Sequence, residues 1–171
     1  LKKKTTNLSF YGSRNLPNKH NHIIFKFKNF KLIYNDPRRF GFFKILKNKI
    51  DYLRFFTRIG PEAISKDFNK TYLSKILKKR TKNIKNLLLD QKLVSGLGNI
   101  YVNEILYYAK INPFKKSCLI SINENKRIVK YSKIILKKAI YFGGSSIRDF
   151  KGITGKSGNF QSEFKVYDRE E

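Results

Sequence analysis

Two adjacent arginines and a phenylalanine follow a turn signal in the first part of the chain. The segment Asn35-Asp-Pro-Arg-Arg-Phe-Gly41 places Arg38, Arg39 and Phe40 directly after a proline. An arginine can form two hydrogen bonds to a base edge, and a phenylalanine can wedge between stacked bases. Because the chain has 29 lysines but only nine arginines, the pair stands out from its background. The segment predicts a DNA-contacting tip, but these residues alone fit a proline turn with solvated arginines and a core phenylalanine more simply.

A glycine-rich step between two predicted helices offers a second binding chemistry. Gly96-Leu-Gly-Asn99 precedes an apolar helical pattern, and the start of a helix carries unpaired N–H groups and a positive dipole end. That arrangement suits a phosphate, and the basic residues between Lys75 and Lys85 could line the same groove. The alternative is that glycine closes one helix, Asn99 caps the next and the basic run is a solvated face.

Other polar residues give weaker indications of a functional site. His20 and His22 suggest metal ligands, but two histidines and one cysteine cannot complete a usual metal site. Asp90 and Glu104 lie singly on predicted helices, without a partner that would mark acid–base catalysis. The Gly-Gly-Ser-Ser segment at 143–146 could cup a phosphate or a base through its N–H groups, or could simply end a helix.

The charge of the chain points to a polyanionic partner. Its 171 residues include 38 Lys and Arg against 12 Asp and Glu, a formal net charge of +26, for which nucleic acid is the default partner. Hydrophobic residues make up 40% of the chain, enough for a folded core. A single cysteine excludes a disulfide framework and fits a reducing compartment. We find no apolar run of membrane-spanning length and no signal peptide, and expect a cytoplasmic protein without membrane contact.

The first third of the chain is patterned for strands. Residues 22–28 and 31–34 form apolar runs on either side of a turn at Asn29, and residues 40–45 predict a third strand after the proline turn. Residues 57–70 carry breakers and no clear period, which predicts a linker. We therefore predict a β part over residues 1–56.

From Thr71 onward the apolar spacing becomes helical. Stripes at 72–77 and 84–88 predict two helices, and a third helix is expected from Ile100 to Lys110 with Asn99 as its N-cap.

A capping-box pattern opens the longest predicted helix. Ser121 and Glu124 have the required spacing, and the helix is expected to end at the glycines 143 and 144. Glycines at 152–158 predict a loop, and residues 164–167 could begin a final strand. The fold class expected is α+β, with strands first and helices second.

Taken in order, eight segments resemble the bacterial formamidopyrimidine-DNA glycosylase family. Together they reach from one end of the chain almost to the other, and a generic basic protein has no reason to hold them in this order. The segments are residues 19–22, 35–41, 59–62, 84–91, 96–104, 143–150, 158–161 and 166–169.

The resemblance implies a fold and an activity. The fold is the C-terminal part of a β-sandwich domain (1–56), an interdomain linker (57–70) and a mostly helical helix–two-turn–helix domain (71–171). The activity is base-excision repair of double-stranded damaged DNA, in which a glycosylase and abasic-site lyase removes oxidised purines and cuts the strand. The damaged nucleotide is flipped out, and an N-terminal proline amine forms a Schiff base at C1′. A complete family member is expected to hold one Zn2+ and to act as a nucleoid-associated monomer.

The resemblance also assigns roles to particular residues. Its DNA-binding positions are His20, Arg38, Arg39, Phe40, Arg80 and Asn99. Arg38 would face the orphaned opposite base, Phe40 would wedge the kinked duplex open, and Asn99 would bind a phosphate. Ser145 and Ser146 belong to a loop that resembles the one closing over the everted base.

Three departures from the family pattern stand beside these matches. The chain starts at Leu1 rather than at the catalytic Pro-Glu, and it stops at Glu171 where a four-cysteine zinc finger would begin. Phe10 lies where a gap-filling methionine belongs and is a void-filling candidate. We therefore expect no catalytic residue, no metal ligand and no cofactor in this segment, and no activity from it alone.

Three interpretations follow. The chain is an internal piece of a working glycosylase, or a non-catalytic DNA-binding remnant of one, or a basic structural nucleic-acid binder. The order of the matched segments disfavours the third.

Overall fold

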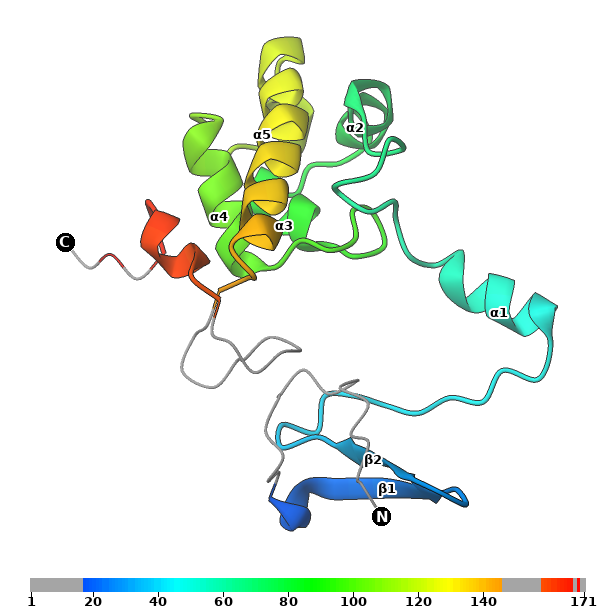
Figure 1. Cartoon of the computed structure of the whole chain (residues 1–171). Coiled ribbons are helices and arrows are strands. Elements are labelled where there is room, and N and C mark those ends of the chain that lie inside the picture. The colour runs from blue at the N-terminus through cyan, green and yellow to red at the C-terminus, as the bar shows by residue number, and fades with distance from the viewer. Residues whose placement is uncertain (1–16, 146–157, 168, 170–171) are drawn as a thin grey trace. The chain divides into compact units, whose positions relative to one another are not determined.

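The computed structural model describes residues 17–145, 158–167 and 169 (Figure 1). By its contacts the chain divides into two compact units. The hairpin unit comprises Leu1–Ile45 with Phe142–Gln161, and the helical unit comprises Leu46–Tyr141 with Ser162–Glu171. Helices and a small antiparallel sheet confirm a mixed α and β chain, and the predicted domain boundaries at residues 56 and 70 stay a prediction.

The hairpin unit is built on two antiparallel strands. β1 (Asn21–Lys26) pairs with β2 (Lys31–Asn35), and Ile24 lies opposite Ile33. The connecting turn is closed by the Phe27 N–H, which donates to the Phe30 carbonyl over 2.9 Å. The rings of these two phenylalanines stack with centroids 4.5 Å apart. The predicted hairpin is confirmed.

Two stretches predicted as strands are not strands. Residues 40–45 form no regular element. The Phe43 ring packs against Phe25 and Tyr34 of the hairpin, with centroids 5.3 and 5.1 Å apart. Residues 49–56, predicted within the β part, form helix α1 (Lys49–Phe56). Its N-cap is Asn48, whose side chain accepts the Asp51 N–H, a local signal that outweighs β-propensity.

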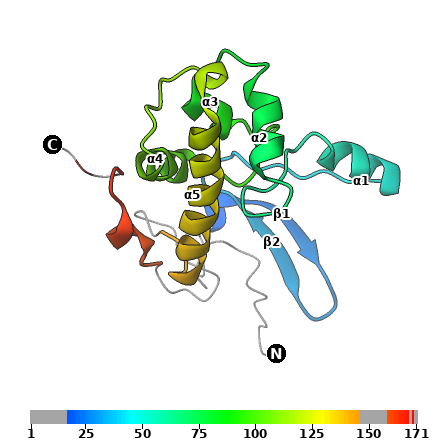
Figure 2. The same cartoon turned by 90° about the horizontal axis from the view of Figure 1, so that it is seen from above.

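Four amphipathic helices make the core of the helical unit. They are α2 (Lys70–Leu77), α3 (Ile84–Leu89), α4 (Asn99–Tyr108) and α5 (Ile122–Tyr141). α5 packs against both α2 and α4, and α3 packs against α4 (Figures 1 and 2). The apolar stripes predicted from the sequence are the buried faces, with Leu73, Leu77, Ile84, Leu87 and Leu88 at 0–4% exposure. Among the described helices, none is both long and apolar enough to cross a membrane.

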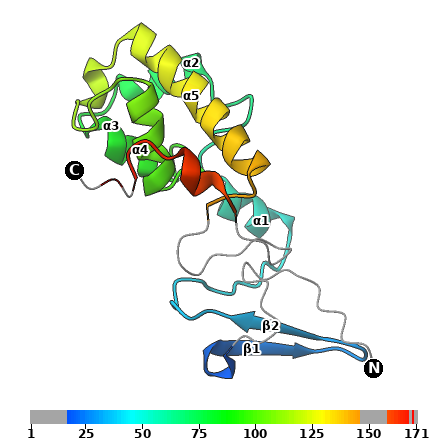
Figure 3. The same ribbon diagram turned by 60° about the vertical axis from the view of Figure 1, so that its left-hand side comes forward.

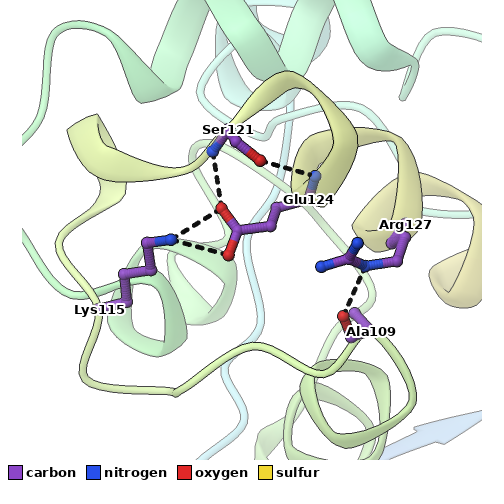
Figure 4. A network of polar contacts seen from close by, with 5 residues as sticks. All are labelled: Ala109, Lys115, Ser121, Glu124 and Arg127. Carbon is purple, nitrogen blue, oxygen red and sulfur yellow. Dashed lines mark hydrogen bonds and ion pairs between the residues drawn. The ribbon is translucent and has the colours of Figure 1, made fainter.

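The predicted capping box at the start of α5 is confirmed. The Ser121 N–H donates to Glu124 Oε2 over 2.7 Å, and the Glu124 N–H donates to Ser121 Oγ over 3.2 Å. Lys115 Nζ lies 2.8 Å from both carboxylate oxygens of Glu124, and Arg127 Nε donates to the Ala109 carbonyl one turn further along (Figure 4). Because the Glu124 carboxylate accepts a backbone N–H and pairs with the Lys115 ammonium, the N-terminus of α5 is held to the loop that precedes it.

The Glu124 network predicts a pH-dependent contribution to stability. Burial raises the pKa of Glu124, but the Lys115 ammonium and the Ser121 N–H and hydroxyl outweigh burial and hold it below its ordinary value of 4.5. A lowered folded-state pKa means that the stabilisation is present above the unfolded-state pKa and lost as pH falls through the folded-state pKa. We expect Glu124→Gln to cost about 1 kcal/mol at neutral pH and less at acidic pH, as pH falls below 4.5 and through the lowered folded-state pKa. Urea unfolding at neutral and at acidic pH checks this, and a cost that does not change with pH would contradict it.

Residues 57–70 were predicted as a linker. Residues 57–69 have no helix or strand between α1 and α2 but are packed into the helical unit, and Lys70 already begins α2. The Gly60 N–H donates to the Gln91 carbonyl over 2.9 Å, and the Ser95 N–H donates to the Pro61 carbonyl over 3.0 Å. Two apolar side chains of the stretch are buried, those of Ala63 and Phe68. The breakers therefore mark a segment whose backbone pairs with the loop before α4.

The predicted final strand at 164–167 is wrong. Phe160–Glu163 forms a short 3-10 helix, and residues 165–167 turn after it. The reason is that the N–H groups of Lys165, Val166 and Tyr167 all donate to one carboxylate, that of Glu104. Those N–H groups are then unavailable to a sheet.

Candidate nucleic-acid interface

The turn formed by residues 35–41, called the arginine turn below, is organised around the carboxylate of Asp36. Asp36 Oδ1 accepts the N–H groups of Arg38 and Arg39 over 3.1 and 3.0 Å. Asp36 Oδ2 accepts the Gly41 N–H over 2.8 Å and the Tyr34 hydroxyl over 3.1 Å. These bonds hold the turn although Arg39 has a φ of 55°, in the left-handed region that non-glycine residues rarely adopt.

The same bonds affect the ionisation of the carboxyl group. The Gly41 N–H lowers the pKa of Asp36, partial desolvation opposes this, and the Tyr34 hydroxyl and the two arginine N–H groups lower it further. The net pKa lies below its ordinary value, so Asp36 is anionic at neutral pH.

The side chains beyond this turn point away from the core. The Arg38 guanidinium lies 4.8 Å from the centroid of the Phe40 ring, a cation–π contact. Phe40 is 78% exposed, so the interpretation of Phe40 as a core residue is wrong. An exposed aromatic ring backed by a guanidinium can insert between bases while the cation faces a base edge.

Both histidines lie at the base of the turn. His22 Nε2 donates to the Asp36 carbonyl over 2.9 Å, and the Asp36 N–H donates to the His20 carbonyl over 3.0 Å. His20 is half-buried in a short 3-10 helix. Within the described ranges, no three His, Cys, Asp or Glu side chains are grouped to hold a metal ion. The residues that the structure describes therefore do not fit the zinc ion that the resemblance implies.

The start of α4 differs from the prediction in one respect. Asn99 was expected as the N-cap, but Gly98 occupies that position and caps with no side chain, and Asn99 is the first helical residue. The reason is the preceding loop, in which Gln91 accepts the Gly96 N–H over 2.9 Å and donates to the Leu97 carbonyl over 2.7 Å. The exposed Asn99 side chain is therefore not engaged in capping, and an anion can approach the first N–H groups of α4.

Arg80 lies near the loop that precedes α4. The Tyr72 hydroxyl donates to the Leu93 carbonyl over 2.7 Å, just before the glycine-rich step. Burial raises the pKa of Tyr72, and the positive charge of Arg80 opposes that rise. Arg80, half-buried after α2, thus lies close to the tyrosine that holds the loop.

The six predicted DNA-binding residues fall into two groups. His20 and Arg38–Phe40 belong to the hairpin unit, while Arg80 and Asn99 belong to the helical unit. Ser145 forms an isolated antiparallel bridge with Asn159. Phe10 and Ser146 lie outside the described residues.

One polar residue was dismissed from the sequence and is central in the structure. Glu104 is 1% exposed; its Oε2 accepts the Lys165 N–H over 2.9 Å, and its Oε1 accepts the N–H groups of Val166 and Tyr167 over 2.9 and 3.0 Å. Figure 3 shows this later segment beside α4. An acid at an apolar position of a helix, between Val102 and Ile105, was the one sequence signal available, because a buried carboxylate needs donors.

Comparison with known proteins agrees with these features. The model of the H2TH domain of formamidopyrimidine-DNA glycosylase matches residues 59–151, more than half of the chain. A formamidopyrimidine-DNA glycosylase of Roseobacter denitrificans is 42% identical over 163 residues, covering 94% of this chain and 58% of that protein.

Two solved structures share the fold and contain DNA. MutM in complex with DNA containing carbocyclic 8-oxo-G has a TM-score of 0.77 at 40% identity, covering 90% of this chain and 56% of that one. Lactococcus lactis Fpg in complex with DNA containing an abasic site has a TM-score of 0.75 at 39% identity, covering 90% and 57%. This chain therefore spans somewhat more than half the length of its relatives, and it belongs to the formamidopyrimidine-DNA glycosylase family.

Proposed function

We propose that the protein containing this chain excises oxidised purines from double-stranded DNA and cuts the strand at the resulting abasic site. In this proposal the chain supplies DNA binding, and the attacking proline amine belongs to the complete protein. The observation that carries the proposal is the exposed Arg38–Phe40 pair on a preorganised turn. The DNA-containing relatives support it, because one complex holds DNA with an oxidised guanine analogue and the other an abasic site.

Each group of residues has a separate task in the proposed mechanism. A target base has to leave the stack before its sugar can be attacked, which costs unstacking energy. Phe40 occupies the space between base pairs, and Arg38 forms hydrogen bonds with the base left without a partner. Asn99 and the first N–H groups of α4 bind a backbone phosphate, which sets the register of the duplex without reading sequence.

The remaining parts of the proposal concern the setting of the reaction. We propose that the protein acts as a monomer on the nucleoid and that a zinc ion, if bound, takes its ligands from residues outside the described ranges. The runner-up is a DNA-binding remnant without lyase activity. Both interpretations require the same DNA contacts, so binding is the first property to test.

We expect the chain to bind duplex DNA with a steep salt dependence, because basic side chains release counterions from the phosphates. The probe is a duplex carrying a tetrahydrofuran abasic analogue opposite each of the four bases in turn. Arg38→Ala should reduce the preference among opposite bases by about tenfold, since one paired arginine contact is worth about 1–3 kcal/mol of discrimination. Asn99→Ala should weaken binding to all four duplexes alike.

Exposed residues elsewhere provide matched controls for these variants. Arg54→Ala in α1 and Asn123→Ala in α5 remove the same side-chain types from exposed positions, and we expect less than a twofold change. A salt-independent affinity, or equal and uniform losses from Arg38→Ala and Asn99→Ala, would contradict the proposed function.

A further inference from the structure

The side chain of Asp36 bonds to the arginine turn at several points along its backbone. Its two carboxylate oxygens accept three backbone N–H groups, from Arg38, Arg39 and Gly41, and the Tyr34 hydroxyl. Its own backbone joins the turn to both histidines. The carboxylate is therefore the common partner of the backbone that carries Arg38 and of the backbone that follows Phe40.

A carboxylate is needed at this position for its acceptor capacity. All four groups that approach Asp36 are donors, and a carboxylate has two oxygens that only accept. An asparagine amide would keep one oxygen and present an NH2 group to the donors at the other. The turn would then lose bonds to at least one of the Arg38–Arg39 pair or the Gly41–Tyr34 pair.

The neighbouring residues restrict how the donors can approach the Asp36 carboxylate. A side chain at Gly41 would overlap the Tyr34 hydroxyl, so Gly41 leaves room for the tyrosine to reach the carboxylate. The Tyr34 ring is itself held edge-on against Phe43, with centroids 5.1 Å apart. Arg39 has a left-handed φ of 55°, a conformation that costs energy in a non-glycine residue, and its N–H is bonded to the carboxylate over 3.0 Å.

We propose that Asp36 is a positioning residue for opposite-base discrimination: without touching DNA, its carboxylate holds the Arg38 and Phe40 backbone in the one arrangement that aims both side chains at the duplex. The inference rests on the proposed function, because it concerns which base is preferred beside the lesion. Asp36 would thus set the selectivity of the site, while the lysines and arginines set its overall affinity.

The test compares Asp36→Asn with Tyr34→Phe and with Asp67→Asn in the full chain. Asp67 is exposed, so Asp67→Asn makes the same change of one charge away from the turn. Binding is measured to the four tetrahydrofuran duplexes, and amide exchange of Arg38, Arg39 and Gly41 is measured in the free protein. A melting curve for each variant establishes that the rest of the protein stays folded.

We expect Asp36→Asn to lower the ratio between the most and least preferred opposite bases from about tenfold to about twofold, and to speed exchange of the three amides. The salt dependence should stay as in the unchanged chain, because every cation remains. Tyr34→Phe removes one donor of four and should have a smaller effect in the same direction, and Asp67→Asn should have none.

Two negative results have different meanings. If the unchanged chain discriminates among the opposite bases and Asp36→Asn discriminates equally well, Asp36 is not a positioning residue and the inference is overturned, whatever the amides do. If the unchanged chain shows no preference for the lesion duplex over an undamaged one, the proposed function fails and the inference falls with it.

Discussion

Replacing Glu104 by glutamine is expected to lower the free energy of unfolding by about 2–3 kcal/mol, although the two side chains have nearly the same shape. The carboxylate is buried and accepts three consecutive backbone N–H groups, at residues 165–167. Hydrogen bonds to a charged group contribute about 1.5–3 kcal/mol each, and a buried donor left without a partner costs about 1–3 kcal/mol. In the variant, the Lys165 N–H would face an NH2 group instead of an oxygen.

Denaturant unfolding measures the loss, and amide exchange locates it. Exchange at residues 165–167 should become faster, most of all at Lys165, whose acceptor is lost, while exchange in α3 should change only as much as global stability does. Glu62→Gln is the matched control, because Glu62 is exposed and its carboxylate should contribute less than about 0.5 kcal/mol. A Glu104→Gln variant as stable as this control would show that residues 165–167 are held by other contacts.

Gly60→Ala is expected to be the most damaging glycine-to-alanine substitution in the described part of the helical unit, with a loss of about 3 kcal/mol or more. A Cβ at this position would overlap the carbonyl group of Leu93 and would lie 2.8 Å from the Val94 nitrogen. These are backbone atoms of the loop that leads to α4, so no side-chain rotation relieves the overlap. Overpacking of this kind typically costs about 1–3 kcal/mol, and displacing the backbone would also break the bond from the Gly60 N–H to Gln91.

Gly98→Ala is the matched control for this prediction. A Cβ at Gly98 meets no atom within 4 Å, and its φ of −106° is accessible to alanine. We expect a loss of at most about 1 kcal/mol, the usual difference between glycine and alanine at an N-cap. Thermal unfolding of both variants measures the contrast. Equal losses would mean that glycine is required at Gly60 for a reason other than close backbone approach.

Local signals in the sequence were sufficient for much of the fold. The capping box of Ser121 and Glu124, the hairpin around Asn29 and the apolar faces of α2 and α3 all have the predicted positions. Each depends on residues a few positions apart, because a helix cap, a tight turn and a 3.6-residue stripe are completed within one or two turns of chain. The ordered motifs likewise sufficed to identify the family.

The tertiary structure decided which polar residues matter. Glu104 looked like an isolated acid, because its donors lie 61 to 63 residues further along the chain. The same bonds converted the predicted strand at 164–167 into a turn, since a donor bound to a carboxylate cannot pair in a sheet.

In the arginine turn, one part of the site could be predicted from the sequence and another part comes only from the tertiary structure. From the sequence, Arg38 and Phe40 stood out by their types and their position after a proline, but these residues alone fitted a core phenylalanine more simply. The Tyr34 hydroxyl and the Gly41 N–H reach the Asp36 carboxylate from two and five positions away. The folded hairpin adds the His22 ring, which bonds to the Asp36 carbonyl from 14 positions away, and Phe40 is exposed beside Arg38. Sequence alone therefore predicted which side chains could read DNA. The tertiary structure added the bonds between the Asp36 backbone and the two histidines, because these bonds join positions 14 and 16 residues apart that meet only when β1 and β2 pair.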